Sequence, residues 1–136
     1  MKFNTQIRYG LRAMVEIAKA DQETGIFQKD ISERQKISIK YLDHIIQSLK
    51  TAGLIINVKG KKSGYRLTRN ASEITTLDIH NAFEPEIAIV ECLSKHITCE
   101  FESICHTNPF WQGLNDIIVE YFSNATLEDL VKNREI

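Results

Sequence analysis

The stretch ISIKYLDHIIQSLKTAGLIINVKGKKSGYRL, residues 37–67, decides the fold. Its first half has apolar residues at helical spacing, which predicts a helix with one buried face. That face consists of Leu42, Ile45, Ile46 and Leu49. Ser38 suits the N-cap of this helix, and Gly53 suits the position just after its last turn. The pattern then becomes strand-like, and two short strands at 54–58 and 65–68 flank a basic turn that contains glycine.

Two further helices are predicted before this stretch. Apolar residues at helical spacing indicate one over residues 5–19, and a shorter one fits residues 28–34, with Ile31 as its buried anchor. A turn, QKIS at 35–38, joins the short helix to the next. The order helix, helix, turn, helix, hairpin is that of a winged helix-turn-helix. We therefore expect a mainly α fold with a small β-hairpin and a DNA-binding domain over residues 1–70.

The charge of the chain is divided unevenly between its two halves. Residues 1–70 contain fourteen Lys or Arg and six Asp or Glu, a net charge of +8, whereas residues 71–136 contain three and twelve, a net charge of −9. Cationic side chains displace the counterions condensed on phosphates, so the first half favours a polyanionic partner. The alternative is an uneven distribution without function, whose field is screened by solvent and salt.

The polar and basic residues of the third helix and the hairpin fall where a winged helix meets double-stranded DNA. In such folds this helix enters the major groove, and its N-terminal residues meet base edges. Asp43 is suited to accept a hydrogen bond from the amino group of cytosine, and Lys40 to contact guanine or a phosphate. Wing lysines position the protein on phosphates. An amphipathic helix with a solvated face would explain the helix but not the basic hairpin beside it. The predicted DNA-binding residues are Ser38, Lys40, Tyr41, Asp43, His44, Lys59, Lys61, Lys62 and Arg66.

The second half begins with residues 71–107, which we expect to hold a short linker helix and then a segment without clear periodicity. The Asn-Pro pair at 108–109 favours the start of a longer helix, with Asn108 as N-cap. This helix is apolar on more than one face, which indicates either an intramolecular core or a dimerisation helix, and we expect the latter. Thr126 suits the cap of a last short helix. We expect residues 108–136, which hold the long helix and this short one, to form the dimerisation region. The residues expected in the dimer interface are Phe110, Trp111, Leu114, Ile117, Ile118 and Tyr121.

All three cysteines lie in CLSKHITCEFESICH, at Cys92, Cys99 and Cys105, and His106 follows the last one. Their neighbours are polar or acidic, which disfavours a role as small core residues. Thiolates bind zinc, copper(I) or iron–sulfur clusters. Structural zinc usually takes cysteine pairs with about two to four residues between them, and no such pair occurs here. The spacing favours a cluster, but a zinc site, a thiol-oxidation switch and simple packing remain open alternatives.

Composition disfavours several other classes of protein. Charges interrupt residues 1–20, so no signal peptide is apparent, and no apolar run approaches the roughly 20 residues that span a bilayer. We therefore expect a cytoplasmic protein with reduced thiols and no membrane partner. The chain has no Cys-x-x-Cys pair, and GKKSG lacks the spacing of a phosphate-binding loop, so we do not expect an enzyme. A protein-binding adaptor would not need the basic residues between positions 36 and 69.

These features together resemble the iron–sulfur winged-helix repressors, the family of IscR, NsrR and CymR, over nearly the whole chain, and most of all the IscR-type members. The resemblance rests on RYGLRAM at 8–14, ISERQKIS and KYL within 31–42, LKTAGLI at 49–55, VKGKKSGYRL at 58–67, the three cysteines, Trp111 and ATLEDLV at 125–131. It implies a homodimer in which the long helix crosses onto the partner chain. It also implies that Cys92, Cys99 and Cys105 hold a 2Fe–2S or 4Fe–4S cluster, and that the protein controls genes of iron–sulfur assembly or of the response to nitric oxide or oxidants.

The sequence departs from this family at the fourth cluster ligand. The first cysteine interval is one residue longer than is usual, and Asn108 occupies the place of the ligating histidine of IscR-type members. The acidic N-terminal ligand of the nitric-oxide-sensing branch corresponds to Arg8, which cannot bind a metal. His106 is the nearest suitable side chain, with acidic residues, His96, a partner-chain residue or an external ligand as alternatives. We expect a change at the cluster to reorder residues 84–107 and to shift the dimerisation helix against the DNA-reading helices.

Overall fold

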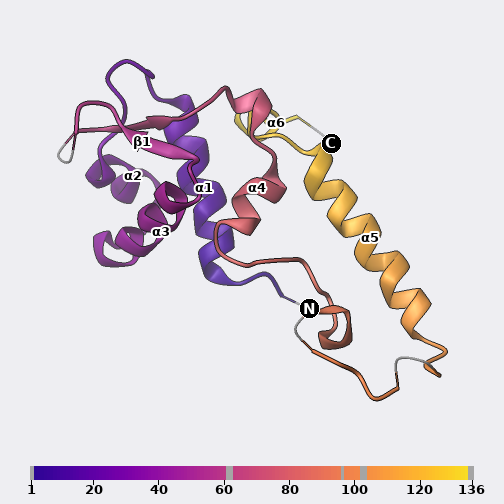
Figure 1. Ribbon diagram of the computed structural model, residues 1–136. Helices are drawn as coiled ribbons and strands as arrows, with labels where there is room; N and C mark the ends of the chain where they lie inside the picture. Colours follow the sequence, from indigo (N-terminus) through magenta and orange to yellow (C-terminus); the bar gives the residue numbers. More distant parts are fainter. Residues whose placement is uncertain (1, 61–62, 96, 102–103, 135–136) are drawn as a thin grey trace.

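The structure of the chain, a computed structural model, describes residues 2–60, 63–95, 97–101 and 104–134. It is mainly helical with an antiparallel hairpin, which confirms the expected fold class. In chain order the elements are α1 (Thr5–Lys19), α2 (Gln28–Gln35), α3 (Ile39–Thr51), β1 (Ile55–Asn57), β2 (Tyr65–Leu67), a 3₁₀ helix (Ala71–Glu73), α4 (Thr76–Asn81), a second 3₁₀ helix (Glu91–Leu93), α5 (Asn108–Asn124) and α6 (Leu127–Val131). Figure 1 shows α1 to β2 gathered on one side of the molecule and α5 running along the other.

Helix α1 forms the centre of the core. Asn4 caps its first turn, because the side-chain Oδ1 accepts a hydrogen bond from the backbone N–H of Ile7 at 2.9 Å. Ala13, Met14 and Ile17 are fully buried on its inner face. The helix packs against α2, α3, β2, α4 and α6. It therefore joins the first half of the chain to the short helices of the second half.

Helices α2 and α3 form the helix-turn-helix. Ile31 anchors α2 and is fully buried, as the sequence predicts. Lys36 ends α2 in a left-handed conformation, with φ 57° and ψ 43°. The chain enters α3 through Ser38, whose Oγ accepts from the backbone N–H of Tyr41 at 3.2 Å. The predicted apolar face of α3 is buried, and the left-handed Gly53 follows the last turn.

Strands β1 and β2 form the wing. They pair antiparallel, with Ile55 opposite Leu67. Tyr65 also bridges to Ile26, and its N–H donates to the Ile26 carbonyl at 2.8 Å, which ties the hairpin to the loop between α1 and α2. The two backbones lie so close that a Cβ on Gly64 would come within 2.9 Å of the Ile26 nitrogen, so this position requires glycine.

Helices α4 and α6 are joined at their first residues. Thr75 and Thr126 each form a capping box, with Asp78 and Asp129 respectively. The two threonines also pair with each other in an antiparallel bridge. Ile79 of α4 is fully buried in the core beside α1. The cap predicted at Thr126 is therefore confirmed, and both helices belong to the same core as the DNA-binding half.

Helix α5 lies to the side of this core. It is connected to α4 near its C-terminal end, where the Thr76 hydroxyl donates to the Phe122 carbonyl at 2.8 Å. The predicted N-cap at Asn108 is wrong by one residue: Thr107 is the N-cap, because its carbonyl already accepts the N–H of Trp111 at 3.1 Å. Within the described residues, α5 and the other helices all fall short of the length and apolarity that a bilayer crossing requires.

Candidate functional site

The N-terminal turns of α3 present polar side chains outward. Lys40, Asp43 and His44 are exposed, and Ser38 is used as the N-cap. Tyr41 is directed elsewhere, since its ring packs edge-on against Tyr9 with the centroids 5.5 Å apart, and it is half-buried against the core. Of the residues predicted on this helix, Lys40, Asp43 and His44 therefore form the outward surface.

A residue that the sequence analysis did not select holds Asp43. The side-chain Nε2 of Gln28, at the start of α2, lies 2.6 Å from Asp43 Oδ1 and 3.2 Å from the carbonyl oxygen of Ile39. This contact links the beginning of α2 to the beginning of α3. No local pattern could have revealed it, because a glutamine at a helix start is unremarkable and its partner lies 15 residues further on.

The tip of the wing is organised by Ser63. Its Oγ accepts the backbone N–H of Lys59 at 2.8 Å and donates to the Gly60 carbonyl at 2.7 Å. Lys59 itself is exposed, so its ammonium group faces outward. Arg66 is half-buried, and its guanidinium donates to the Leu67 carbonyl at 3.0 Å. The two other predicted wing residues, Lys61 and Lys62, lie outside the described residues.

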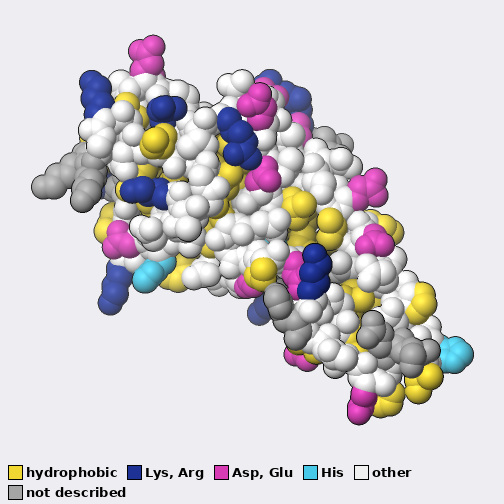
Figure 2. All heavy atoms as spheres, viewed as in Figure 1, with side chains coloured by type: hydrophobic (Ala, Val, Ile, Leu, Met, Phe, Trp, Pro, Cys, Tyr) yellow, Lys and Arg dark blue, Asp and Glu magenta, His cyan; other side chains and the backbone are white. Residues whose placement is uncertain are grey.

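The charge asymmetry of the sequence is also an asymmetry of the surface. Figure 2 shows Lys and Arg side chains over the part of this face that is formed by α1 to β2, and Asp and Glu side chains along α5. Lys40 of α3 and Lys59 next to β1 are exposed, as are Asp116 and Glu120 of α5. On this face, basic side chains therefore lie over the elements of the helix-turn-helix and the wing.

The three cysteines lie on residues 84–107, here called the cysteine segment. All three thiols are free and half-buried. Cys92 belongs to the short 3₁₀ helix Glu91–Leu93, and the turn after it is held by Glu86, whose Oε1 accepts from the hydroxyl of Ser94 and the backbone N–H of Lys95. A hydrogen bond from the Thr107 side chain, with Oγ1 3.3 Å from the sulfur, lowers the pKa of the Cys105 thiol.

The described part of the cysteine segment does not bring its ligand-type side chains together. Among the residues that the structure describes, no three His, Cys, Asp or Glu side chains form a group able to hold a metal ion. His106 is exposed beside Cys105. The donor set nevertheless has the chemistry of an iron–sulfur site, since reduced thiols are the usual ligands of such clusters. The structure thus presents suitable donors on one segment, but not an assembled site.

Two asparagines fasten the start of the cysteine segment to helices on either side. Asn4 Nδ2 donates to Glu84 Oε1 at 2.7 Å, so the residue that caps α1 also holds the segment. Asn115 of α5 is buried, donates to the Ile87 carbonyl at 3.0 Å and accepts from the Ile89 N–H at 2.9 Å. Sequence reasoning missed both contacts, because each joins residues that are far apart in the chain. Together they connect α1, the cysteine segment and α5.

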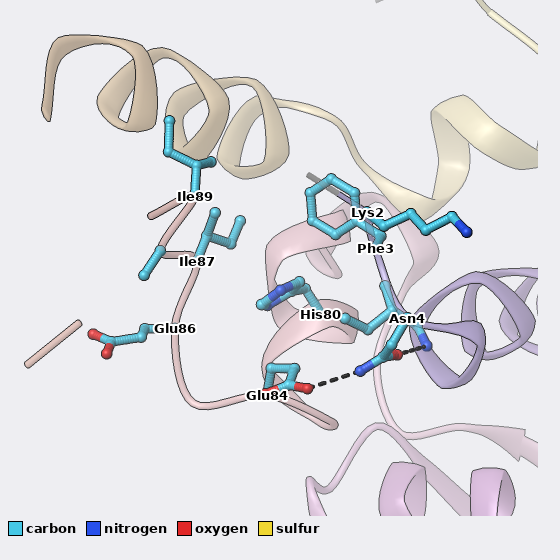
Figure 3. Close-up of a pocket in the computed structure, with 10 residues that line it drawn as sticks. Lys2, Phe3, Asn4, His80, Glu84, Glu86, Ile87 and Ile89 are labelled. Carbon is cyan, nitrogen blue, oxygen red and sulfur yellow. Dashed lines mark hydrogen bonds between the residues drawn. The ribbon is translucent and has the colours of Figure 1, made fainter. Parts of the chain in front are cut away.

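A cavity of about 200 Å³ lies where these parts meet. Figure 3 shows it between the start of α1, α4 and the cysteine segment, with Glu84 bonded to Asn4 and with Ile87 and Ile89 along the chain that leads away. The buried ring of His80 forms one wall and contacts Phe3 edge-on, with centroids 6.0 Å apart. Its Nδ1 lies 3.1 Å from Asn81 Oδ1. The junction is therefore packed around a hollow.

One face of α5 is apolar and is left exposed by the described residues of the chain. Its exposed fractions are 64% for Phe110, 38% for Leu114, 65% for Ile117 and 51% for Tyr121. Trp111 and Ile118 are half-buried, and Asn115 alone of the residues of α5 is buried. The four exposed side chains are therefore not part of an intramolecular core, which was the alternative to a dimerisation helix.

A helix-turn-helix with an outward-facing polar helix and a wing beside it defines a DNA-binding transcription regulator of the winged-helix class. Comparison with known proteins leads to the same class. Residues 3–133 match the family described as "Rrf2: Iron-dependent Transcriptional regulator". The chain belongs to the Rrf2 family.

Individual relatives agree with this assignment. The HTH-type transcriptional regulator IscR of Pectobacterium atrosepticum is 34% identical over 136 residues, which cover the whole chain and 82% of that protein. The structure is similar to that of CymR (YrzC), the global cysteine regulator of B. subtilis, with a TM-score of 0.79 and 30% identity over 99% of both chains. It is also similar to IscR of T. potens, with a TM-score of 0.76 and 30% identity over 99% of this chain and 89% of that one. The protein is thus an IscR-like transcriptional regulator with a DNA-binding fold, and its relatives are named as regulators rather than enzymes.

Proposed function

We propose that the protein is a homodimeric repressor whose affinity for operator DNA is set by an iron–sulfur cluster on its cysteine segment. The observation that carries the proposal is that all three thiols lie on a segment hydrogen-bonded to both α1 and α5. A change in that segment acts on the central helix of the DNA-binding domain and on the dimerisation helix together. The signal would be iron–sulfur status, redox stress or nitric oxide.

A second copy of the chain is the partner proposed for α5. The exposed apolar face of this helix includes Phe110 and Ile117, and no other part of the described chain covers it. Burial of four such side chains contributes about 6–10 kcal/mol before the cost of association. A two-fold axis beside α5 would present two copies of α3 to two half-sites of double-stranded DNA.

Cys92, Cys99 and Cys105 are the proposed cluster ligands, with His106 as the candidate for the fourth. These thiols are reduced and accessible in part, as ligands must be before a cluster is inserted. Because they do not form a group in the chain alone, the segment would have to rearrange to bring them together. The bound 2Fe–2S or 4Fe–4S cluster would supply the redox-active centre.

The hydrogen bonds of Asn4 and Asn115, here called the two tethers, would transmit a rearrangement of the cysteine segment to the DNA-binding half. Asn115 would move α5 with the segment, and Glu84 would act on the capped end of α1 through Asn4. A ligand shifts such an equilibrium only by binding the two arrangements with different affinity. A coupling free energy of about 1–3 kcal/mol would change operator affinity roughly 5- to 150-fold.

Anaerobic purification followed by visible absorbance and by iron and sulfide analysis tests the proposed cofactor. Iron and inorganic sulfide bound in equal amounts would support a cluster. Colourless protein with stoichiometric zinc would replace it with a zinc-bound regulator, and colourless, metal-free protein whose DNA affinity follows thiol oxidation would replace it with a thiol switch.

Gel-shift titration with duplexes selected from a random library tests the control of DNA binding. The Cys92→Ala variant should bind with an affinity different from that of the cluster-loaded wild type. The matched control is Thr98→Ala, an exposed position on the same segment, which should behave as wild type. Identical affinities for the Cys92→Ala variant and the wild type would leave a DNA-binding protein without this sensor.

A further inference from the structure

The contact between Gln28 and α3 fixes the direction of a side-chain amide. Gln28 Nε2 lies 2.6 Å from Asp43 Oδ1 and 3.2 Å from the Ile39 carbonyl oxygen. Both neighbours can only accept hydrogen bonds, so the amide must present its NH₂ group to them. Both N–H donors of the amide are then engaged within the protein. The carbonyl oxygen of the amide is the polar atom that remains to contact DNA.

This arrangement leaves an acceptor surface at the start of the DNA-reading helix. Asp43 is exposed, and one of its carboxylate oxygens is bound to Gln28, which leaves Oδ2 as an acceptor. Glutamine in the major groove usually recognises adenine with one donor and one acceptor. Gln28 cannot do so here, because its donors are engaged. Gln28 and Asp43 therefore present acceptors to an approaching base pair.

We propose that Gln28 is a specificity-determining residue, which orients the Asp43 carboxylate so that α3 selects a base with an exocyclic amino group. The bases concerned are cytosine, through N4, and adenine, through N6. The acceptor atoms O6 and N7 of guanine and O4 of thymine would face the carboxylate unfavourably. The inference rests on the proposed DNA binding and adds the chemistry that this helix recognises.

A purely structural role for Gln28 makes a different prediction. Ile31 of α2 and Leu42 of α3 are fully buried, so the core already sets the relative position of the two helices. If Gln28 only strengthened that packing, its removal would lower affinity for all sequences alike. If it orients Asp43, its removal would change the preference at one position of each half-site and leave the others unchanged.

The test compares binding of wild type, Gln28→Ala, Asp43→Ala and the double variant to duplexes with every base pair at each operator position. Wild type should favour cytosine or adenine at the position that depends on Asp43, by roughly 5- to 150-fold. Both single variants should lose this preference there, and the double variant should lose no more than Asp43→Ala does. The matched control is Gln47→Ala, because Gln47 is an exposed glutamine of α3 that bonds Thr51, away from the first turn.

Base analogues distinguish the two amino groups. Replacing cytosine by 2-pyrimidinone, or adenine by purine, removes only the exocyclic amino group, and the wild-type preference should disappear with one of them. A Gln28→Ala variant that keeps the preference at the Asp43-dependent position, or that weakens every sequence equally, would overturn the inference. Wild-type protein that binds no sequence selectively would instead overturn the proposed operator binding, so the two failures are distinguishable.

Discussion

Lys36 carries a left-handed backbone at the turn between α2 and α3, with φ 57°. A residue with a Cβ loses roughly 1–2 kcal/mol in this conformation, whereas glycine adopts it freely. Glycine also gives the unfolded chain more conformational entropy, which removes part of the gain. We expect Lys36→Gly to raise the free energy of unfolding by about 0.5–1 kcal/mol and Tm by roughly 2–4 °C. Thermal unfolding followed by circular dichroism measures both changes.

The matched control at this position is Lys36→Ala, which removes the charge but keeps the Cβ. Lys36 is exposed, so neither variant disturbs core packing. The alanine variant should unfold within about 0.5 kcal/mol of wild type, as surface substitutions usually do. Equal stabilisation by glycine and alanine would show that the gain comes from reducing the positive charge of this half, not from the backbone.

At the scale of secondary structure, the sequence predicts those elements whose signals are local. The helix expected over residues 5–19 is α1 as observed, and the caps at Ser38 and Thr126 form as their residue types suggest. The start of α5 differs by one residue because the carbonyl of Thr107 already accepts the first hydrogen bond of the helix, and this backbone contact defines the N-cap whatever the side chain. Local patterns also could not tell whether the apolar face of α5 is covered.

The exposed face of α5 leads to a prediction about assembly. A carboxylate at position 117 would be buried without a partner in the proposed dimer, so Ile117→Asp should weaken association by several kcal/mol and yield monomer at micromolar concentration. Because Ile117 is 65% exposed in the single chain, the fold of the monomer should survive. Sedimentation velocity measures the assembly, and circular dichroism checks the fold.

An exposed polar residue of α5 provides the control for this assembly experiment. Glu120 is exposed and lies outside the apolar face, so Glu120→Ala should sediment as wild type. Wild-type protein that is monomeric at these concentrations, or an Ile117→Asp variant that remains dimeric, would exclude the proposed interface.

At the scale of the whole molecule, we expect the basic half to supply two different kinds of DNA contact. Lys59 lies on the wing and should neutralise a phosphate, so Lys59→Ala should weaken binding to all sequences alike and reduce the slope of log K against log salt by about one. Lys40 lies on α3 and should instead change the preference among sequences. Fluorescence anisotropy at several salt concentrations measures both effects. If the two variants act alike, the division of roles between wing and helix is wrong.

Some features of the candidate site can be predicted from the local sequence, and others cannot. Residue types on α3 and the wing, and the cysteines themselves, are visible in the sequence. The contacts of Gln28, Glu84 and Asn115 are not, because each depends on segments brought together by the core. The arrangement of the thiols is least predictable, since the cysteine segment contains little regular structure to fix their separation.

The tether at Asn4 allows coupling across the molecule to be tested without loss of the fold. Serine is about as good an N-cap as asparagine, but it has no amide to donate to Glu84. Asn4→Ser should therefore keep the free energy of unfolding within about 0.5 kcal/mol of wild type, whereas Asn4→Ala should lose about 1 kcal/mol. In both variants, the operator affinity of protein with intact cysteines should approach that of the Cys92→Ala background, so the ratio of the two affinities should fall toward one. If both tethers act through one path, adding Asn115→Ala should reduce this ratio no further. A ratio unchanged by Asn4→Ser would mean that the cysteine segment reaches the DNA-binding half by another route, and that Asn4 only caps a helix.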